Sequence, residues 1–145
     1  MSKKIILVVV TVLVIVLSFS IITRIQTKNL EKKIGIKAVN LLYSFNDIYE
    51  LDKNMSELNK ICTEKVYNEL TIDNENRTLN TYLKFKEDSV KVKVIKSRSN
   101  YVLYRLKTDA ISKDRLFVFI YDVNNKGKIS YVREVEAIDF VQNID

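Results

Sequence analysis

An uncharged, mainly apolar run extends from Ile5 to Ile22, and two lysines precede it. A helix of this length is about 27 Å long, close to the roughly 30 Å hydrocarbon core of a bilayer. Although Val, Ile and Leu dominate the run, a single segment in lipid satisfies its backbone groups only as a helix. We therefore predict a tail of residues 1–4 and one spanning helix over residues 5–23. Representative positions of this span are Ile5, Val10, Leu13, Leu17 and Ile22.

A cleavable signal peptide is the alternative interpretation of this run. Lys3 and Lys4 would form its charged region, and Ser18 and Ser20 place small residues at a cleavage position. The apolar run continues past that position to Ile22, which favours a retained anchor. Long domains translocate largely regardless of charge, so the lysines after the span decide little. We expect a single-pass cell-membrane protein whose C-terminal domain is extracytoplasmic.

Beyond the span, apolar residues recur at helical spacing and predict an amphipathic helix from about Lys28 to Leu51. Gly35 lies inside this stripe, which is also too short for a coiled coil, so packing on a sheet explains it better. Ser56 and Thr63 each look like the N-cap of a short helix. The stripe is Ile34, Ala38, Leu41, Phe45 and Ile48, begun by Leu30. The expected buried positions of the short helices are Met55, Leu58, Ile61, Cys62, Val66 and Leu70.

After residue 80 the apolar period changes from 3.6 to 2, which indicates β-strands. The clearest hairpin turn is Asn124 to Gly127. Short connections favour an antiparallel sheet, with helices covering one face. The expected strands are 81–86, 90–94, 101–108, 115–123 and 128–138. The expected fold class is α+β: a transmembrane helix, then two to three helices packed on a curved antiparallel sheet of four to five strands, forming one domain over residues 24–145.

The composition argues against most familiar enzyme classes. The chain has no histidine, the commonest general base and zinc ligand, and its single cysteine excludes an intrachain disulfide. No phosphate loop, metal cluster or nucleophile motif is present. Eight tyrosines and many carboxylates occur, but no carboxylate lies on a clearly apolar face, so we assign no acid–tyrosine pair. We predict a non-enzyme with no catalytic, cofactor or metal site, and Cys62 as a core residue.

Two surfaces are candidates for binding. The strand 115–123 is apolar on both faces, which requires cover on both sides, from this chain or from another. The candidate interface is Phe117, Phe119, Tyr121, Tyr104 and Tyr131. The second candidate is a basic hairpin. We favour the interpretation that its basic side chains form a solvated face that discourages pairing with the edge strand of another sheet. Binding of nucleic acid is the less favoured interpretation. Its residues are Lys84, Lys86, Lys91, Lys93, Lys96 and Arg98. Separately, the lysines Lys28, Lys32 and Lys33 could contact anionic lipid if they faced the cytoplasm.

The order of elements resembles the nuclear transport factor 2-like cone domains, of the cystatin-like type. The segments that carry this resemblance are Leu58 to Leu70, Arg115 to Tyr121, and Lys126 to Ile129. Membrane-anchored members include bitopic assembly components of type IV secretion and conjugation machines, whose small domain contacts itself and other subunits. The Gram-negative branch carries an Asn-Pro-x-Gly motif, whereas this chain has no proline. The resemblance thus favours a Gram-positive-type relative, or the stalk-like domain before some penicillin-binding transpeptidases.

The expected function is that of a non-enzymatic, membrane-anchored assembly or scaffold subunit of a conjugative secretion channel. Its partners would be the lipid bilayer, further copies of itself and other subunits of a membrane complex. Two alternatives remain open: a secreted or anchored cone protein that binds a ligand or catalyses a reaction, and a cytoplasm-facing module that binds nucleic acid or lipid through the lysine-rich hairpin.

Overall fold

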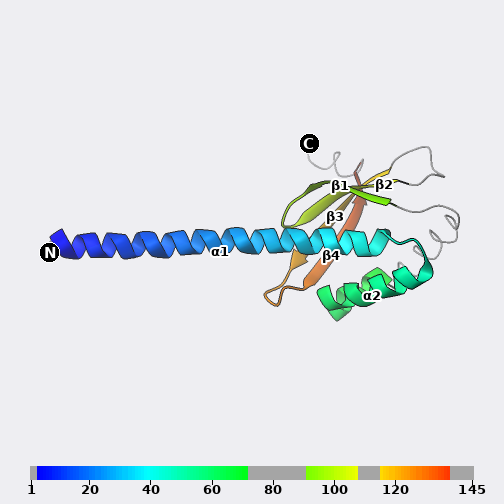
Figure 1. Cartoon of the computed structure of the whole chain (residues 1–145), viewed down its shortest axis with the longest axis horizontal. Helices are drawn as coiled ribbons and strands as arrows, with labels where there is room; N and C mark the ends of the chain where they lie inside the picture. The colour runs from blue at the N-terminus through cyan, green and yellow to red at the C-terminus, as the bar shows by residue number, and fades with distance from the viewer. Residues whose placement is uncertain (1–2, 72–90, 108–114, 138–145) are drawn as a thin grey trace.

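The protein consists of one very long helix, shorter helices and a four-stranded sheet (Figure 1). The structure is a computed structural model that describes residues 3–71, 91–107 and 115–137. The helices are α1 (Lys3–Tyr43), α2 (Ile48–Ile61) and a third over residues 64–71. The strands are β1 (Lys91–Ser97), β2 (Tyr101–Lys107), β3 (Arg115–Val123) and β4 (Ile129–Glu136). The predicted α+β class is therefore confirmed, and the strand expected over 81–86 lies outside the described residues.

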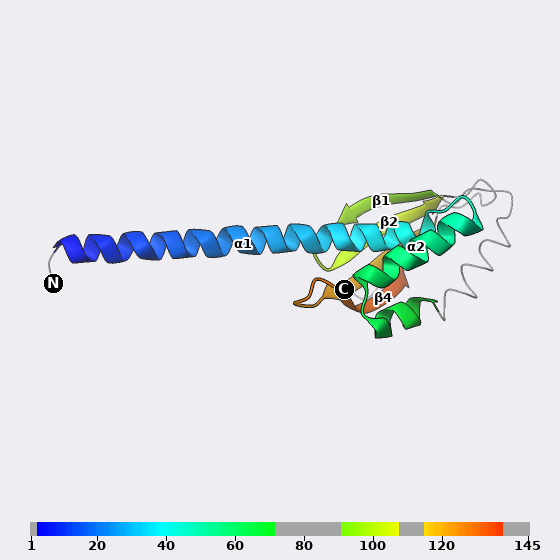
Figure 2. The same cartoon turned by 60° about the horizontal axis from the view of Figure 1, so that its bottom comes forward.

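The sheet is an antiparallel meander with the order β1-β2-β3-β4. Its last connection is the turn predicted from the sequence. The Asn124 side-chain oxygen accepts hydrogen bonds from the backbone N–H groups of Lys126 (2.9 Å) and Lys128 (3.0 Å). Gly127 supplies the positive φ of 72° that the chain needs to turn back. The C-terminal half of α1 lies across one face of this sheet, and α2 runs back beside it (Figures 1 and 2).

The predicted span and the predicted amphipathic helix are a single helix, α1, which ends at Tyr43 and not near Leu51. A new helix begins because Asp47 adopts an extended backbone and its carboxylate accepts the N–H of Glu50 at 2.8 Å. The Glu50 carboxylate in turn accepts the N–H of Asn46 at 2.8 Å. The boundary prediction was wrong because the apolar spacing continues across this break. The cap predicted at Ser56 is also wrong, because Ser56 lies within α2.

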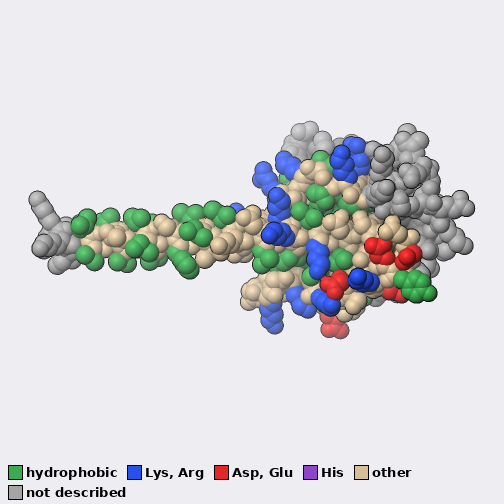
Figure 3. Space-filling model, in the orientation of Figure 1, with side chains coloured by type: hydrophobic (Ala, Val, Ile, Leu, Met, Phe, Trp, Pro, Cys, Tyr) green, Lys and Arg blue, Asp and Glu red, His purple; other side chains and the backbone are tan. Residues whose placement is uncertain are grey.

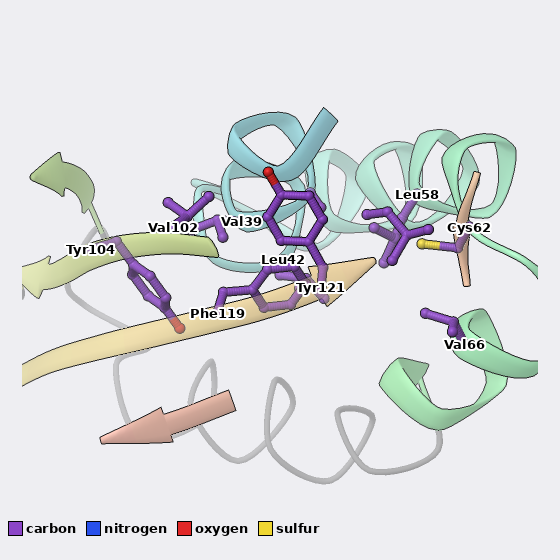
Figure 4. Packing of buried hydrophobic residues seen from close by; sticks show 11 residues of the cluster. Val39, Leu42, Leu58, Cys62, Val66, Val102, Tyr104, Phe119 and Tyr121 are labelled. Atoms are coloured by element: carbon purple, nitrogen blue, oxygen red, sulfur yellow. The ribbon is translucent and has the colours of Figure 1, made fainter. Parts of the chain in front are cut away.

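The core lies between α1 and the sheet (Figure 4). Ala38, Val39 and Leu42 of α1 are fully buried. Burial is confirmed for Leu58, Cys62 and Val66, whereas Met55, Ile61 and Leu70 are partly buried around them. Leu30 remains 56% exposed, so the buried stripe of α1 begins after it. The third helix starts at residue 64, directly after Thr63, as the sequence predicts.

Candidate functional site

The most conspicuous feature is the N-terminal part of α1, which stands free of the domain (Figures 1 and 2). Every residue from Leu7 to Leu30 is exposed, and burial begins only at Glu31. We call residues 7–23 the apolar arm. This helix is long and apolar enough to cross a membrane, although a signal sequence passes the same test. The Leu and Val side chains of the arm are half to two-thirds exposed. Contact of this much continuous apolar surface with water is unfavourable, so the arm requires an apolar environment.

Three of the four hydroxyl side chains of the apolar arm, those of Thr11, Ser18 and Thr23, are satisfied within the helix itself. The hydroxyl of Thr11 donates to the carbonyl of Leu7 at 2.9 Å, and that of Ser18 donates to Val14 at 2.8 Å. Thr23 donates to Phe19 in the same way at 3.1 Å. A hydroxyl bonded to the carbonyl one turn earlier leaves no unsatisfied donor in an apolar medium. These residues are therefore compatible with lipid.

The arm is joined to the domain without a break, and Tyr121 of β3 makes the closest contact at the joint (Figure 4). Its hydroxyl donates towards the carbonyls of Glu31 (3.0 Å) and Arg98 (2.9 Å), which links α1 to the β1–β2 turn. The ring lies directly over Gly35, where a Cβ atom would collide with it. The absence of a side chain at this position therefore lets the helix approach the sheet closely.

The candidate interface on β3 is instead the inner face of the sheet. Phe119, Tyr121 and Tyr104 have 0% exposure beneath the helices, and Phe117 is packed against the same core. These side chains cannot form an interface while the helices lie over them, so the structure corrects the choice of face. Only Tyr131, which is 47% exposed, remains accessible.

The opposite face of the strand is also apolar, and it is covered in part, because Val118 is only 1% exposed. Leu103, Val118 and Val135 form a cross-strand row on it, in register from β2 to β4. Ile120 is half-buried beside this row, and Tyr131 lies on the same face. Neither α1 nor α2 packs here, because both lie against the inner face (Figures 1 and 2). We call these five residues the outer sheet face.

A polar cluster that the sequence analysis did not find lies at the C-terminal end of α1. The Tyr43 hydroxyl donates a short hydrogen bond to the carboxylate of Glu134. The Tyr43 ring stacks on that of Tyr104 with centroids 5.5 Å apart, and Tyr104 stacks in turn on Phe117 at 5.8 Å. We call Tyr43, Tyr104 and Glu134 the tyrosine–glutamate cluster. Glu134 was missed although a signal existed: it alternates with Val132, which points to the core.

The cluster contains the buried hydroxyl of Tyr104, which makes no hydrogen bond of ordinary geometry within the described residues although Tyr43 and Glu134 lie beside it. Burial raises the pKa of this hydroxyl well above its usual range, and the neighbouring Tyr43 and Glu134 raise it further. Tyr104 is therefore a neutral hydrogen-bond donor at any physiological pH and cannot serve as a base. The arrangement can bind a polar atom, or it can fix the end of α1 on β4.

The structure describes only part of the predicted basic hairpin. Lys93, Lys96 and Arg98 are exposed on β1 and the turn that follows it, and Lys91 begins β1. The remaining two members, Lys84 and Lys86, lie outside the described residues.

Cys62 is buried, as predicted, and burial raises the pKa of its thiol to about 11. A thiol with this pKa is protonated at neutral pH and is a poor nucleophile. Among the described residues, no group of His, Cys, Asp and Glu side chains could hold a metal ion.

Comparison with known proteins found no matching family model, no matching curated protein and no matching solved structure. The functional argument therefore rests on the geometry of this chain: the apolar arm, the rigid joint, the outer sheet face and the tyrosine–glutamate cluster.

Proposed function

We propose that the protein is a non-enzymatic, membrane-anchored assembly subunit that acts by protein–protein binding. The main support for the proposal is the difference between the two halves of α1. The first half is exposed and apolar, and the second half is part of the domain core. An anchor joined to a domain by a flexible linker would leave the domain free to tumble. A continuous helix instead fixes the height and tilt of the domain above the bilayer.

Such a fixed domain favours weak lateral contacts. Confinement to the membrane plane raises the effective concentration of copies and partners, so modest interfaces suffice. We assign these contacts to the accessible part of the outer sheet face, around half-buried Ile120 and exposed Tyr131, because neither α1 nor α2 packs on it. The cone family and the conjugative secretion channel are proposals that rest on the architectural resemblance. The extracytoplasmic location of the domain is a proposal that rests on the signal-anchor layout, in which a short basic tail precedes the apolar run.

The test uses the full chain in native membranes, with two differently tagged copies expressed together. We expect the copies to co-purify, and we expect Ile120→Lys to abolish this association because a charge enters the outer sheet face. Tyr49→Lys is the matched control, since Tyr49 is 82% exposed on α2, away from that face. Protection of Cys62 from alkylation would show that both variants remain folded. Equal association of both variants, or no association of the parent chain, would refute this interface.

The tyrosine–glutamate cluster supports a second candidate, a ligand-binding or enzymatic domain. The specific observation is the buried hydroxyl of Tyr104, which lies next to the carboxylate of Glu134 without a hydrogen bond of ordinary geometry. Isothermal titration of the full chain with neutral and cationic small molecules, comparing the parent with Tyr104→Phe, would test it. Binding that the variant loses, with Cys62 still protected, favours a ligand site. Equal behaviour of the two proteins assigns the cluster to packing.

A further inference from the structure

The two hairpin turns of the sheet lie on the same side of the domain as the apolar arm. The β1–β2 turn is held beside α1, because the Tyr121 hydroxyl contacts the carbonyls of both Glu31 and Arg98. The β3–β4 turn follows directly after Tyr121 and extends further in the same direction (Figures 1 and 2). If the arm crosses a membrane, both turns face its surface.

This side of the domain is strongly basic (Figure 3). Asp122 is the exposed acid near it, and Glu31 is half-buried. The basic residues are exposed, and no ion pair of the described chain involves them. We call this set the basic rim. Its members are Arg24, Lys28, Lys32 and Lys33 of α1, Lys96 and Arg98 at the first turn, and Lys126 and Lys128 at the second.

Among the described residues, three acidic side chains lie on the side of the domain away from the arm, next to Lys53. Asp47, Glu50 and Asp52 lie where α2 begins, at the end of the domain farthest from the arm (Figures 1 and 3).

The rim lies above the end of the apolar arm, within reach of a lipid headgroup layer. Glu31 lies nine residues after Ile22, or about 13 Å along a helix. The headgroup layer begins at the end of the apolar core and is roughly 5–8 Å thick. The turns reach back towards the arm, and the long Lys and Arg side chains extend further. Because α1 does not break, the domain cannot swing away from this surface.

We propose that the basic rim binds the headgroups of anionic phospholipids in the leaflet on the domain side of the membrane. This inference rests on the anchoring part of the proposed function. The rim would set the rotation and tilt of the domain, and thereby the direction in which the outer sheet face is presented to its neighbours. Each basic residue near an anionic surface changes the docking equilibrium by about fivefold.

The chain contains no tryptophan, so a single introduced one reports on a chosen position. Asn125→Trp places the reporter at the tip of the β3–β4 turn, and Tyr49→Trp places it at the distal end as a control. The full chain is reconstituted into phosphatidylcholine vesicles with or without phosphatidylglycerol. A nitroxide on the phosphatidylcholine headgroup quenches the reporter when it lies at the membrane surface.

We expect quenching at position 125 to increase with phosphatidylglycerol and to decrease when the Debye length is shortened from about 10 Å to about 3 Å by salt. Arg98→Gln, Lys126→Gln and Lys128→Gln together should shift the docking equilibrium by about 100-fold and return quenching to its level without anionic lipid. The matched control removes Lys53, Lys60 and Lys65 in the same way and should leave quenching unchanged. The reporter at position 49 should not respond to either lipid.

Carbonate extraction of the same vesicles separates the two hypotheses. If the protein resists extraction but the quenching of its reporter does not change with phosphatidylglycerol, the hypothesis of the basic rim is overturned and that of the anchor is not. Extractable protein would overturn the anchor. Equal loss of quenching in the rim variant and its control would show a net-charge effect only. A response to phosphatidylglycerol that added single-stranded DNA abolishes at equal phosphate concentration would point to nucleic acid as the preferred partner, and would also count against the proposal.

Discussion

Replacing Gly35 with alanine tests the joint between the arm and the domain. The added Cβ would collide with the ring of Tyr121, whose hydroxyl is held by Glu31 and Arg98. Overpacking of this kind costs about 1–3 kcal/mol. Loss of the hydrogen bond that the single Tyr121 hydroxyl shares between the two carbonyls adds about 1 kcal/mol, whereas alanine recovers about 1 kcal/mol of helix propensity. We therefore expect a net loss of about 1–3 kcal/mol in the free energy of unfolding.

The single cysteine provides the assay. Cys62 is 1% exposed in the folded domain and becomes reactive only when the domain opens. Alkylation of the full chain during a temperature ramp therefore reports domain unfolding separately from the apolar arm. For a domain of this size, 1 kcal/mol corresponds to a shift of about 3–5 °C in Tm. The Gly35→Ala variant should therefore unfold about 3–15 °C below the parent.

A double-mutant cycle gives the result that would refute the reasoning. In a Tyr121→Leu background the colliding ring is absent, so Gly35→Ala should be neutral or slightly stabilising. If Gly35→Ala raises Tm in the parent chain, or lowers it equally in both backgrounds, Tyr121 does not lie over the helix as described.

Three further predictions concern the core, the helix boundary and pH. Phe119→Ala should cost about 3–5 kcal/mol and unfold the domain, because its side chain is fully buried; unchanged stability in urea titrations would contradict its assignment to the core. Asp47→Ala should cost about 1 kcal/mol by removing the cap of α2, seen as a lower Tm, with Asp47→Asn close to the parent. Stability should fall as pH rises from about 9 to about 11, because the unfolded state loses the Cys62 proton first; a Cys62→Ala variant that keeps the full slope in circular-dichroism titrations would contradict this.

Local chemistry accounts for the parts of the fold that the sequence predicts well. The Asn124 to Gly127 turn follows from an asparagine side chain that bonds two backbone N–H groups and a glycine with positive φ. The strand from Arg115 to Val123 has the bounds expected from its uninterrupted β-forming residues. The buried positions of α2 and the third helix follow from apolar spacing, because one helical face must meet the core.

The errors arise where local spacing does not decide the tertiary arrangement. The apolar stripe passes from α1 into α2 through Phe45, so periodicity alone hides the break that the Asp47 cap imposes. Strand β3 is apolar on both faces, so no local signal identifies which face the helices cover. The tyrosine–glutamate cluster depends on Tyr43 and Glu134, which are 91 residues apart in sequence. Only the fold brings them together.

The central claim is that α1 is both a retained membrane anchor and a structural element of the domain. The most direct test is alkaline carbonate extraction of membranes that contain the C-terminally tagged full chain, followed by measurement of its mass. The account predicts a carbonate-resistant species of 17.0 kDa plus the tag. A soluble species that has lost the residues before about Ile21 would show that the apolar arm is a cleaved signal peptide, and would contradict both the anchored scaffold and the basic rim.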